Sequence, residues 1–92
     1  LGASIPAEYG GAGGDFRHDV VLVETAAKHG VEGFALSLHN VIILPYILAH
    51  GTEEQKRRWL PKLCSGELVS AIAMSEPGAG SDLQSVRTTA LR

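Results

Sequence analysis

The stretch that decides the fold reads Ala71-Ile72-Ala73-Met74-Ser75-Glu76-Pro77-Gly78-Ala79-Gly80-Ser81-Asp82. It opens with small and apolar residues that are typical of a buried strand, and it changes within two residues to a hydroxyl, a carboxylate, a proline and two glycines. Pro77 removes a backbone donor and favours an extended conformation for Glu76. Gly78 and Gly80 permit a turn and a close approach to another group. The sequence therefore predicts a strand that ends in a loop, which is either a simple turn between strands or a surface of bare N–H groups and hydroxyls for an oxygen-rich ligand.

Three blocks of sequence resemble, in the same order, the signatures of one protein family. Residues 6–14 read PAEYGGAGG and resemble a PEEYGG-x-GG turn, and residues 51–67, with GTEEQK, LP and GE, resemble a helix-to-strand approach. The third block is the string AMSEPGAGSD at residues 73–82, followed by LQ at 83–84 and RTTA at 87–90. It resembles the flavin loop of the acyl-CoA dehydrogenases, and most closely that of the long-chain-like members. The three blocks span residues 6–90, so the resemblance covers nearly the full chain.

The resemblance implies an α+β architecture for this chain. Residues 1–67 would be an incomplete N-terminal helical domain, and residues 68–92 would begin the β-barrel-like middle domain with the flavin loop. Members of the family add a C-terminal helical bundle, and they bind FAD between the last two domains and across a subunit contact. The chain begins at Leu1 and ends at Arg92 just as an apparent strand begins, so we expect it to be a piece of a longer protein.

The resemblance also implies an activity for the parent protein, that of a flavin-dependent oxidoreductase acting on CH–CH donors in fatty-acid β-oxidation or related acyl-CoA catabolism. Family members remove a proton from the carbon next to an acyl-CoA thioester carbonyl, transfer a hydride from the adjacent carbon to flavin N5, and release a trans-2-enoyl-CoA. Electrons then usually pass to an electron-transferring flavoprotein. We expect an acyl-CoA substrate, a homotetramer or homodimer, and a bacterial cytoplasmic location, or the mitochondrial matrix for a eukaryotic source.

The resemblance assigns the flavin contacts to a single run of residues. Backbone groups around Met74 would meet the isoalloxazine edge, and Ser75 stands where the family usually has a threonine that reaches the N5/O4 edge. Ser81 corresponds to a serine close to the pyrophosphate and to the bound acyl-CoA, so it is expected to contact both cofactor and substrate. The predicted cofactor-binding residues are Ile72, Ala73, Met74, Ser75, Glu76, Pro77, Gly78, Ala79, Gly80 and Ser81.

No catalytic residue is predicted in this chain. The family's catalytic base is a glutamate of the C-terminal bundle, which no residue here matches. Glu76 lies beside a proline in a glycine turn, so we predict that its carboxylate is a structural hydrogen-bond acceptor rather than a base. The isolated chain should therefore lack activity. Two alternatives stay open for the parent protein: an acyl-CoA oxidase-like flavoprotein, in which oxygen reoxidises the flavin, and a non-catalytic paralogue that acts as a binding or assembly module and lacks a suitably placed C-terminal glutamate.

Composition narrows the possible functions further. A net charge of −2 and a pI near 6.1 give no excess of positive charge that would attract nucleic acid or an anionic membrane. The longest apolar stretch, residues 41–49, is about half a membrane span and contains Pro45, so no membrane span is expected. Cys64 is the single cysteine, which excludes an intrachain disulfide, and it has no metal-ligand spacing with the histidines. We therefore predict no metal site and no nucleic-acid partner.

Local signals predict a first helix that begins after an Asp15 cap and ends near His29. Glu24 and Lys28 form an i,i+4 pair in the favourable order. Four apolar residues recur at spacings of four, three and four, so they would form one buried stripe on this helix. They are Phe16, Val20, Val23 and Ala27.

A second helix is predicted from Phe34 to His50, and Pro45 should kink it or split it near Leu44. From residue 41 onward this helix is apolar on nearly every side, so neighbouring elements must bury it. His39 and Asn40 interrupt its apolar surface. We predict that they form a polar pair satisfied by backbone or water at a helix contact, rather than a functional site.

A third helix is predicted to start with a capping box formed by Thr52 and Gln55, and Pro61 should end it or bend its last turn. Residues 68–74 and 86–91 then have the small, β-branched and apolar content of strands. Two strands make neither a closed nor a two-sided sheet, so they would need further strands as partners.

Overall fold

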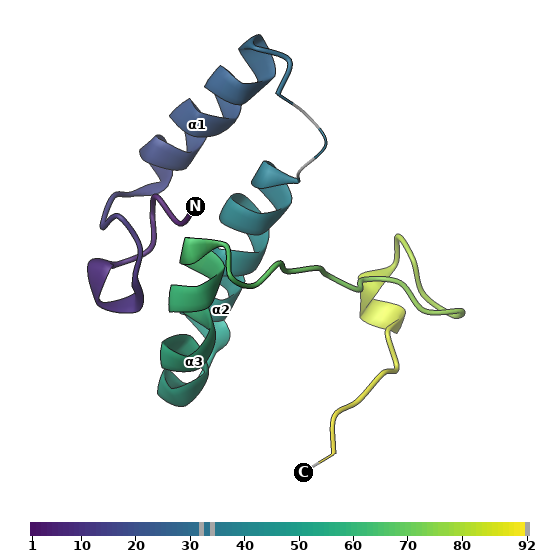
Figure 1. Cartoon of the computed structure of the whole chain (residues 1–92). Coiled ribbons are helices and arrows are strands. Elements are labelled where there is room, and N and C mark those ends of the chain that lie inside the picture. Colours follow the sequence, from purple (N-terminus) through teal and green to yellow (C-terminus); the bar gives the residue numbers. More distant parts are fainter. Residues whose placement is uncertain (32, 34, 92) are drawn as a thin grey trace.

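The structure, a computed structural model, describes residues 1–31, 33 and 35–91, which form three α-helices and shorter helical segments. In chain order the elements are η1 (Ala7–Tyr9), α1 (Phe16–Lys28), η2 (Leu38–Ile43), α2 (Leu44–His50), α3 (Glu53–Ser65) and η3 (Leu83–Ser85). η1 and η3 are 3-10 turns, and η2 is a π-helical segment. Figure 1 shows α2 and α3 packed together and the C-terminal segment extending away from the helices. None of the helices in these residues has the length and apolar character needed to cross a membrane.

α1 begins at the predicted Asp15 cap. The Asp15 side chain accepts a hydrogen bond from a backbone N–H of the first turn (3.0 Å), and the Asp15 N–H donates to His18 Nδ1 (3.1 Å), so the two residues form a capping box. Gly30 follows the helix with a φ of 65°, a left-handed conformation that suits glycine. The predicted ion pair between Glu24 and Lys28 is confirmed at 2.8 Å.

The predicted buried stripe on α1 is wrong. Phe16 and Val20 are 59% and 45% exposed, and Ala27 is exposed as well. Val23 is half-buried, and the fully buried residue of this helix is Asp19. Among the described elements α1 contacts only η2, so a narrow face is covered and most of the apolar stripe stays open to solvent. A periodic pattern shows which face favours burial, but it does not supply the element that covers that face.

The second predicted helix is split next to Pro45, as expected. η2 ends at Ile43 and α2 begins at Leu44, which places Pro45 in the first turn of α2, where its missing N–H costs least. The Leu44 N–H donates to the His39 carbonyl five residues earlier, which is the π-helical pattern. Residue 34, where this helix was predicted to start, lies outside the described residues.

α3 begins with the predicted capping box. The Gln55 N–H donates to Thr52 Oγ1 (3.2 Å), and the Thr52 N–H donates to Gln55 Oε1 (2.8 Å). Of the two expected effects of Pro61, ending the helix is wrong, because α3 continues past the proline and closes at Gly66 with a φ of 80°; a bend in the last turn stays a prediction. A proline inside a helix costs about 3 kcal/mol, so the continuation requires a compensating gain from burial.

The core lies where η1, α2 and α3 meet. Its buried members are Ile5, Tyr9, Leu44, Leu60, Leu63 and Cys64, and Ile47 and Leu48 pack against them. Leu63 and Cys64 both follow Pro61, so their burial accounts for the continuation of α3 beyond the proline. The Tyr9 hydroxyl donates to both carboxylate oxygens of Glu53 (2.8 and 3.0 Å), and this hydrogen bond raises the pKa of Tyr9. It ties η1 to the first turn of α3.

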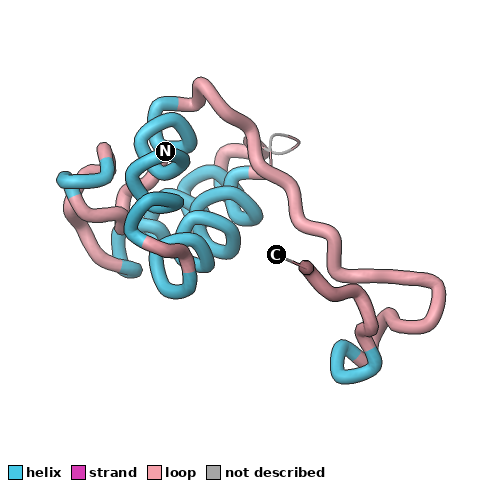
Figure 2. Tube along the Cα trace, turned by 90° about the horizontal axis from the view of Figure 1, so that it is seen from below, coloured by secondary structure: helices cyan, strands magenta, loops and turns pink. Residues whose placement is uncertain are grey.

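The two predicted strands are absent from the described residues. Residues 68–75 and 86–91 form no ladder with any described segment, and the β-bridge in this region joins Glu76 to Ala79 across a turn. Figure 2 shows this part of the chain as loop that extends away from the helices. A strand needs a partner for its N–H and C=O groups, and the described segments provide none here. The helical part of the predicted α+β fold is therefore present, whereas no strand of a β-barrel is found in the residues that the structure describes.

Candidate functional site

A cavity of about 550 Å³ lies between the helical part and the segment that follows α3. Ile42 of η2 and Tyr46 of α2 form one wall. The other lining residues are Ile72, Ala73, Met74, Ser75, Glu76, Leu83, Val86 and Thr88. Five of the ten predicted cofactor-binding residues thus line it, and its surface is mostly apolar with a few polar groups. Such a lining is typical of a site for an organic cofactor or substrate.

The other five predicted residues lie outside the cavity lining. Residues 77–78 form a tight turn, in which the Glu76 N–H donates to the Ala79 carbonyl (2.9 Å) and the Ala79 N–H donates to the Glu76 carbonyl (3.0 Å). Ala79 is buried, whereas Gly80 and Ser81 are exposed. The structure therefore brings the first half of the predicted run to the cavity and leaves the glycine-rich half beside it.

Three donors hold the Glu76 carboxylate. Oε1 accepts from the Arg87 N–H (2.7 Å), and Oε2 accepts from the Thr88 N–H (3.0 Å) and from the Thr88 hydroxyl. The bond from the Thr88 hydroxyl, followed by that from the Arg87 N–H, stabilises the charged form and lowers the pKa of Glu76. A carboxylate with a lowered pKa and occupied lone pairs is a weak general base. Glu76 is thus a structural acceptor that closes the loop, as the sequence indicates.

Gly78 and Gly80 have open space beside them. A Cβ added to either glycine would meet no protein atom within 4 Å, and neither residue adopts a positive φ. The loop conformation therefore does not itself require glycine at these two positions. A ligand that approaches the backbone closely would require it, because a side chain would occupy the same space.

His39 and Asn40 are buried and make the contacts of a structural polar pair. His39 Nε2 lies 3.0 Å from the Leu63 carbonyl oxygen, and its Nδ1 lies 2.7 Å from Ser70 Oγ. The Gly2 N–H donates to Asn40 Oδ1 (3.3 Å). These backbone partners agree with the predicted polar contact at a helix surface, but Asn40 Nδ2 is buried and has no hydrogen-bond partner among the described residues. Ser70 was not predicted as a partner, because nothing in the sequence signals a contact between side chains 31 positions apart.

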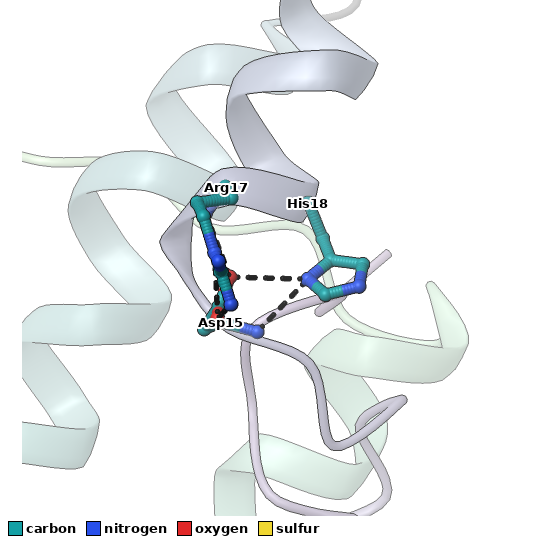
Figure 3. A network of polar contacts seen from close by, with 3 residues as sticks. All are labelled: Asp15, Arg17 and His18. Atoms are coloured by element: carbon teal, nitrogen blue, oxygen red, sulfur yellow. Dashed lines mark hydrogen bonds and ion pairs between the residues drawn. The ribbon is translucent and has the colours of Figure 1, made fainter.

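A second polar cluster lies at the N-terminus of α1. Figure 3 shows the Asp15 carboxylate between the side chains of Arg17 and His18. Arg17 donates to both carboxylate oxygens, with a shortest distance of 2.5 Å, and His18 Nδ1 lies 3.2 Å from Oδ1. The Arg17 guanidinium lowers the pKa of Asp15, and Asp15 raises the pKa of Arg17. The capping by Asp15 and its ion pair with Arg17 explain these exposed contacts, so the cluster stabilises the start of the helix.

The other ionisable groups do not gather into a metal site within the part of the chain that the structure describes. No group of three or more His, Cys, Asp or Glu side chains in residues 1–31, 33 and 35–91 is placed to hold a metal ion. Cys64 is buried in the core, and this burial raises the pKa of its thiol. It is a packing residue of the core cluster.

The chain is similar to known proteins along its whole length. Residues 1–67 match a family model described as the acyl-CoA dehydrogenase, N-terminal domain. The chain is 47% identical over 92 residues to the long-chain specific acyl-CoA dehydrogenase, mitochondrial, of Mus musculus, and 43% identical over 93 residues to the isovaleryl-CoA dehydrogenase, mitochondrial, of Solanum tuberosum. Each match covers 100% of this chain, and the two matches cover 21% and 23% of those relatives.

A solved structure shares the fold. The crystal structure of acyl-CoA dehydrogenase from Geobacillus kaustophilus matches 94% of this chain with a TM-score of 0.81 and 49% sequence identity, and the match covers 23% of that chain. The chain therefore spans about a fifth of the length of the relatives that it matches. Since the family model covers well over half of the chain and the relatives agree with it, the chain belongs to the acyl-CoA dehydrogenase family.

Proposed function

We propose that this chain is a segment of an FAD-dependent acyl-CoA dehydrogenase and that residues 72–81 contact the flavin. The observation that carries the proposal is the cavity of about 550 Å³, because half of the predicted flavin contacts line it. Membership of the family supports it, since the same residues carry the flavin-loop resemblance. Residues 68–92 would then open the middle domain.

The residues present fit a flavin. The isoalloxazine edge alternates donors and acceptors, so the exposed Ser75 hydroxyl and the N–H groups of residues 72–75 are suitable partners. In the described part of the chain those N–H groups donate to no other protein group. Gly78 and Gly80 leave room for close backbone contact, and Ser81 is proposed to reach the pyrophosphate and the acyl-CoA. When bound, FAD would supply the hydride acceptor.

Serine at position 75 keeps the hydroxyl that the family's usual threonine provides, but it lacks the methyl group that stiffens χ1. Ordering the serine side chain costs a few tenths to about 1 kcal/mol. A hydrogen bond to the ring contributes about 1–3 kcal/mol, so this chain is expected to retain flavin binding.

The rest of the reaction depends on residues outside this loop. Glu76 is occupied by three donors, which supports a base supplied by another part of the protein. The proposed reaction converts an acyl-CoA to the trans-2-enoyl-CoA, with an electron-transferring flavoprotein as the acceptor and a homo-oligomer as the assembly. We propose a bacterial cytoplasmic location, or the mitochondrial matrix if the source is eukaryotic.

Replacing Ser75 with alanine in the full-length flavoprotein is expected to raise the FAD dissociation constant about 5- to 150-fold, because one hydrogen bond worth about 1–3 kcal/mol is lost. Titrating the apoprotein with FAD and following flavin fluorescence measures this constant. Ser37→Ala is the matched control, since Ser37 is exposed, caps no helix with its side chain and does not line the cavity. A Ser75→Ala protein that bound FAD and turned over like the parent would contradict the assignment.

A further inference from the structure

His39 connects three parts of the structure through its imidazole ring. The side chain lies on η2 and is 7% exposed. Nε2 lies 3.0 Å from the Leu63 carbonyl oxygen in the last turn of α3, and Nδ1 lies 2.7 Å from Ser70 Oγ beyond the end of that helix. A carbonyl oxygen only accepts, so Nε2 carries a hydrogen. In the neutral ring Nδ1 then accepts a hydrogen bond from the Ser70 hydroxyl.

Ser70 anchors the segment that leads to the cavity. The Leu68 N–H donates to the Lys62 carbonyl (3.1 Å) at the exit from α3. Among the described residues, the His39–Ser70 bond is the one hydrogen bond that joins residues 69–75 to the helical part. Among hydrogen bonds to the helical part, the position of this segment therefore depends on this one part-buried contact.

The helical run that carries His39 also forms the opposite wall of the cavity. Ile42 lies three residues after His39 on η2, and Tyr46 follows on α2, and both line the cavity. The His39–Ser70 bond thus links the element that bears one wall to the segment that bears the other. The π-helical segment that contains His39 agrees with this role, because single-turn π-bulges are frequent at functional sites.

We infer that His39 is a positioning residue, which acts through Ser70 to hold residues 72–76 opposite Ile42 and Tyr46 in the geometry that the flavin needs. It does not line the cavity itself. The part of the inference that concerns the flavin rests on the proposed function. The part that concerns the clamp between His39 and Ser70 can be tested without flavin.

The clamp is tested by hydrogen–deuterium exchange, read by mass spectrometry on the full-length protein. His39→Phe keeps the ring volume and removes both hydrogen bonds, and Ser70→Ala removes the bond between the two residues. Each variant is expected to speed exchange of the Leu68 amide about 5- to 10-fold, because its N–H donates to the Lys62 carbonyl at the exit from α3, next to the contact that is lost. The double variant should show no faster exchange than His39→Phe alone, because the two changes remove the same contact.

The flavin provides the second readout. Ser70→Ala and His39→Phe are expected to raise the FAD dissociation constant about 5- to 10-fold and to shift the visible flavin band, whereas Ser70→Thr, which keeps the hydroxyl, should restore both. His29→Phe and Ser37→Ala are the matched controls, because both residues are exposed and lie outside the cavity lining. A merely structural role would lower stability without moving the flavin band.

The outcomes separate the two parts. Unchanged exchange of the Leu68 amide in both variants would overturn the clamp. Faster exchange with an unchanged FAD affinity and flavin band would overturn the positioning role. A parent protein that holds no flavin would overturn the proposed function, and with it the positioning role, while the exchange readout would still decide whether the clamp exists.

Discussion

Replacing Gly11 with alanine is expected to lower the free energy of unfolding by about 3 kcal/mol or more. The added Cβ would clash with the Ile5 carbonyl oxygen and would lie 2.5 Å from the Ile5 Cβ, and Ile5 is fully buried in the core. The same carbonyl accepts from the Gly13 N–H (2.9 Å), so moving it would break a turn hydrogen bond as well. The clash is with backbone, and a change of rotamer cannot relieve it.

Gly78→Ala is the matched control, because a Cβ at Gly78 would meet no atom within 4 Å and the residue has no positive φ. It should change the free energy of unfolding by less than about 0.5 kcal/mol. Urea unfolding of the 92-residue chain, followed by helical circular dichroism, compares the two variants. Equal midpoints for Gly11→Ala and Gly78→Ala would show that the turn at Gly11 is not packed against Ile5 as described.

Replacing Leu60 with alanine is expected to lower the free energy of unfolding by about 2–5 kcal/mol. Leu60 is fully buried on α3, in the cluster with Ile5, Tyr9 and Leu44 that joins the three elements of the core. Truncation removes apolar contacts and leaves a cavity that the neighbouring side chains fill only in part. Urea unfolding again measures the effect.

Leu22→Ala on α1 is the matched control for this change. Leu22 is 43% exposed and also lies within a helix, so the difference in helix propensity between leucine and alanine is shared by both variants. Its expected loss is less than about 1 kcal/mol. If Leu60→Ala destabilised the chain no more than Leu22→Ala does, the core would not lie between η1, α2 and α3.

The features that the sequence predicted well depend on a few neighbouring residues. Asp15 and the Thr52–Gln55 pair cap their helices because capping needs only the first turn of the helix itself. The change from η2 to α2 beside Pro45 follows from the missing N–H of proline. The partners in such interactions lie within about one helical turn of each other, so the local sequence alone specifies them.

The features that were missed depend on partners distant in the sequence. The stripe through Phe16 and Val20 has the period of a buried face, but α1 meets only η2 among the described elements. The predicted strand at residues 68–74 has suitable composition but no described ladder partner. α3 runs through Pro61 because residues beyond the proline join the core, and proline chemistry alone favours the opposite outcome.

The candidate site was predicted in part. The signature at residues 72–81 located the loop, and the structure places its first five residues on a cavity. The proline and glycines next to Glu76 in the sequence predicted that it is a hydrogen-bond acceptor. They did not predict its donors, Arg87 and Thr88, because these lie 11 and 12 positions away. The opposite wall, with Ile42 and Tyr46, had no signal that distinguished it from ordinary core.

The most direct test of the flavin proposal is the visible absorption spectrum of the full-length protein, recorded before and after anaerobic addition of a medium- or long-chain acyl-CoA. We predict an oxidised flavin spectrum that bleaches when the acyl-CoA is added, because the substrate would be oxidised and the flavin reduced. A colourless protein that FAD does not reconstitute would contradict the assignment of residues 72–81 to a flavin site.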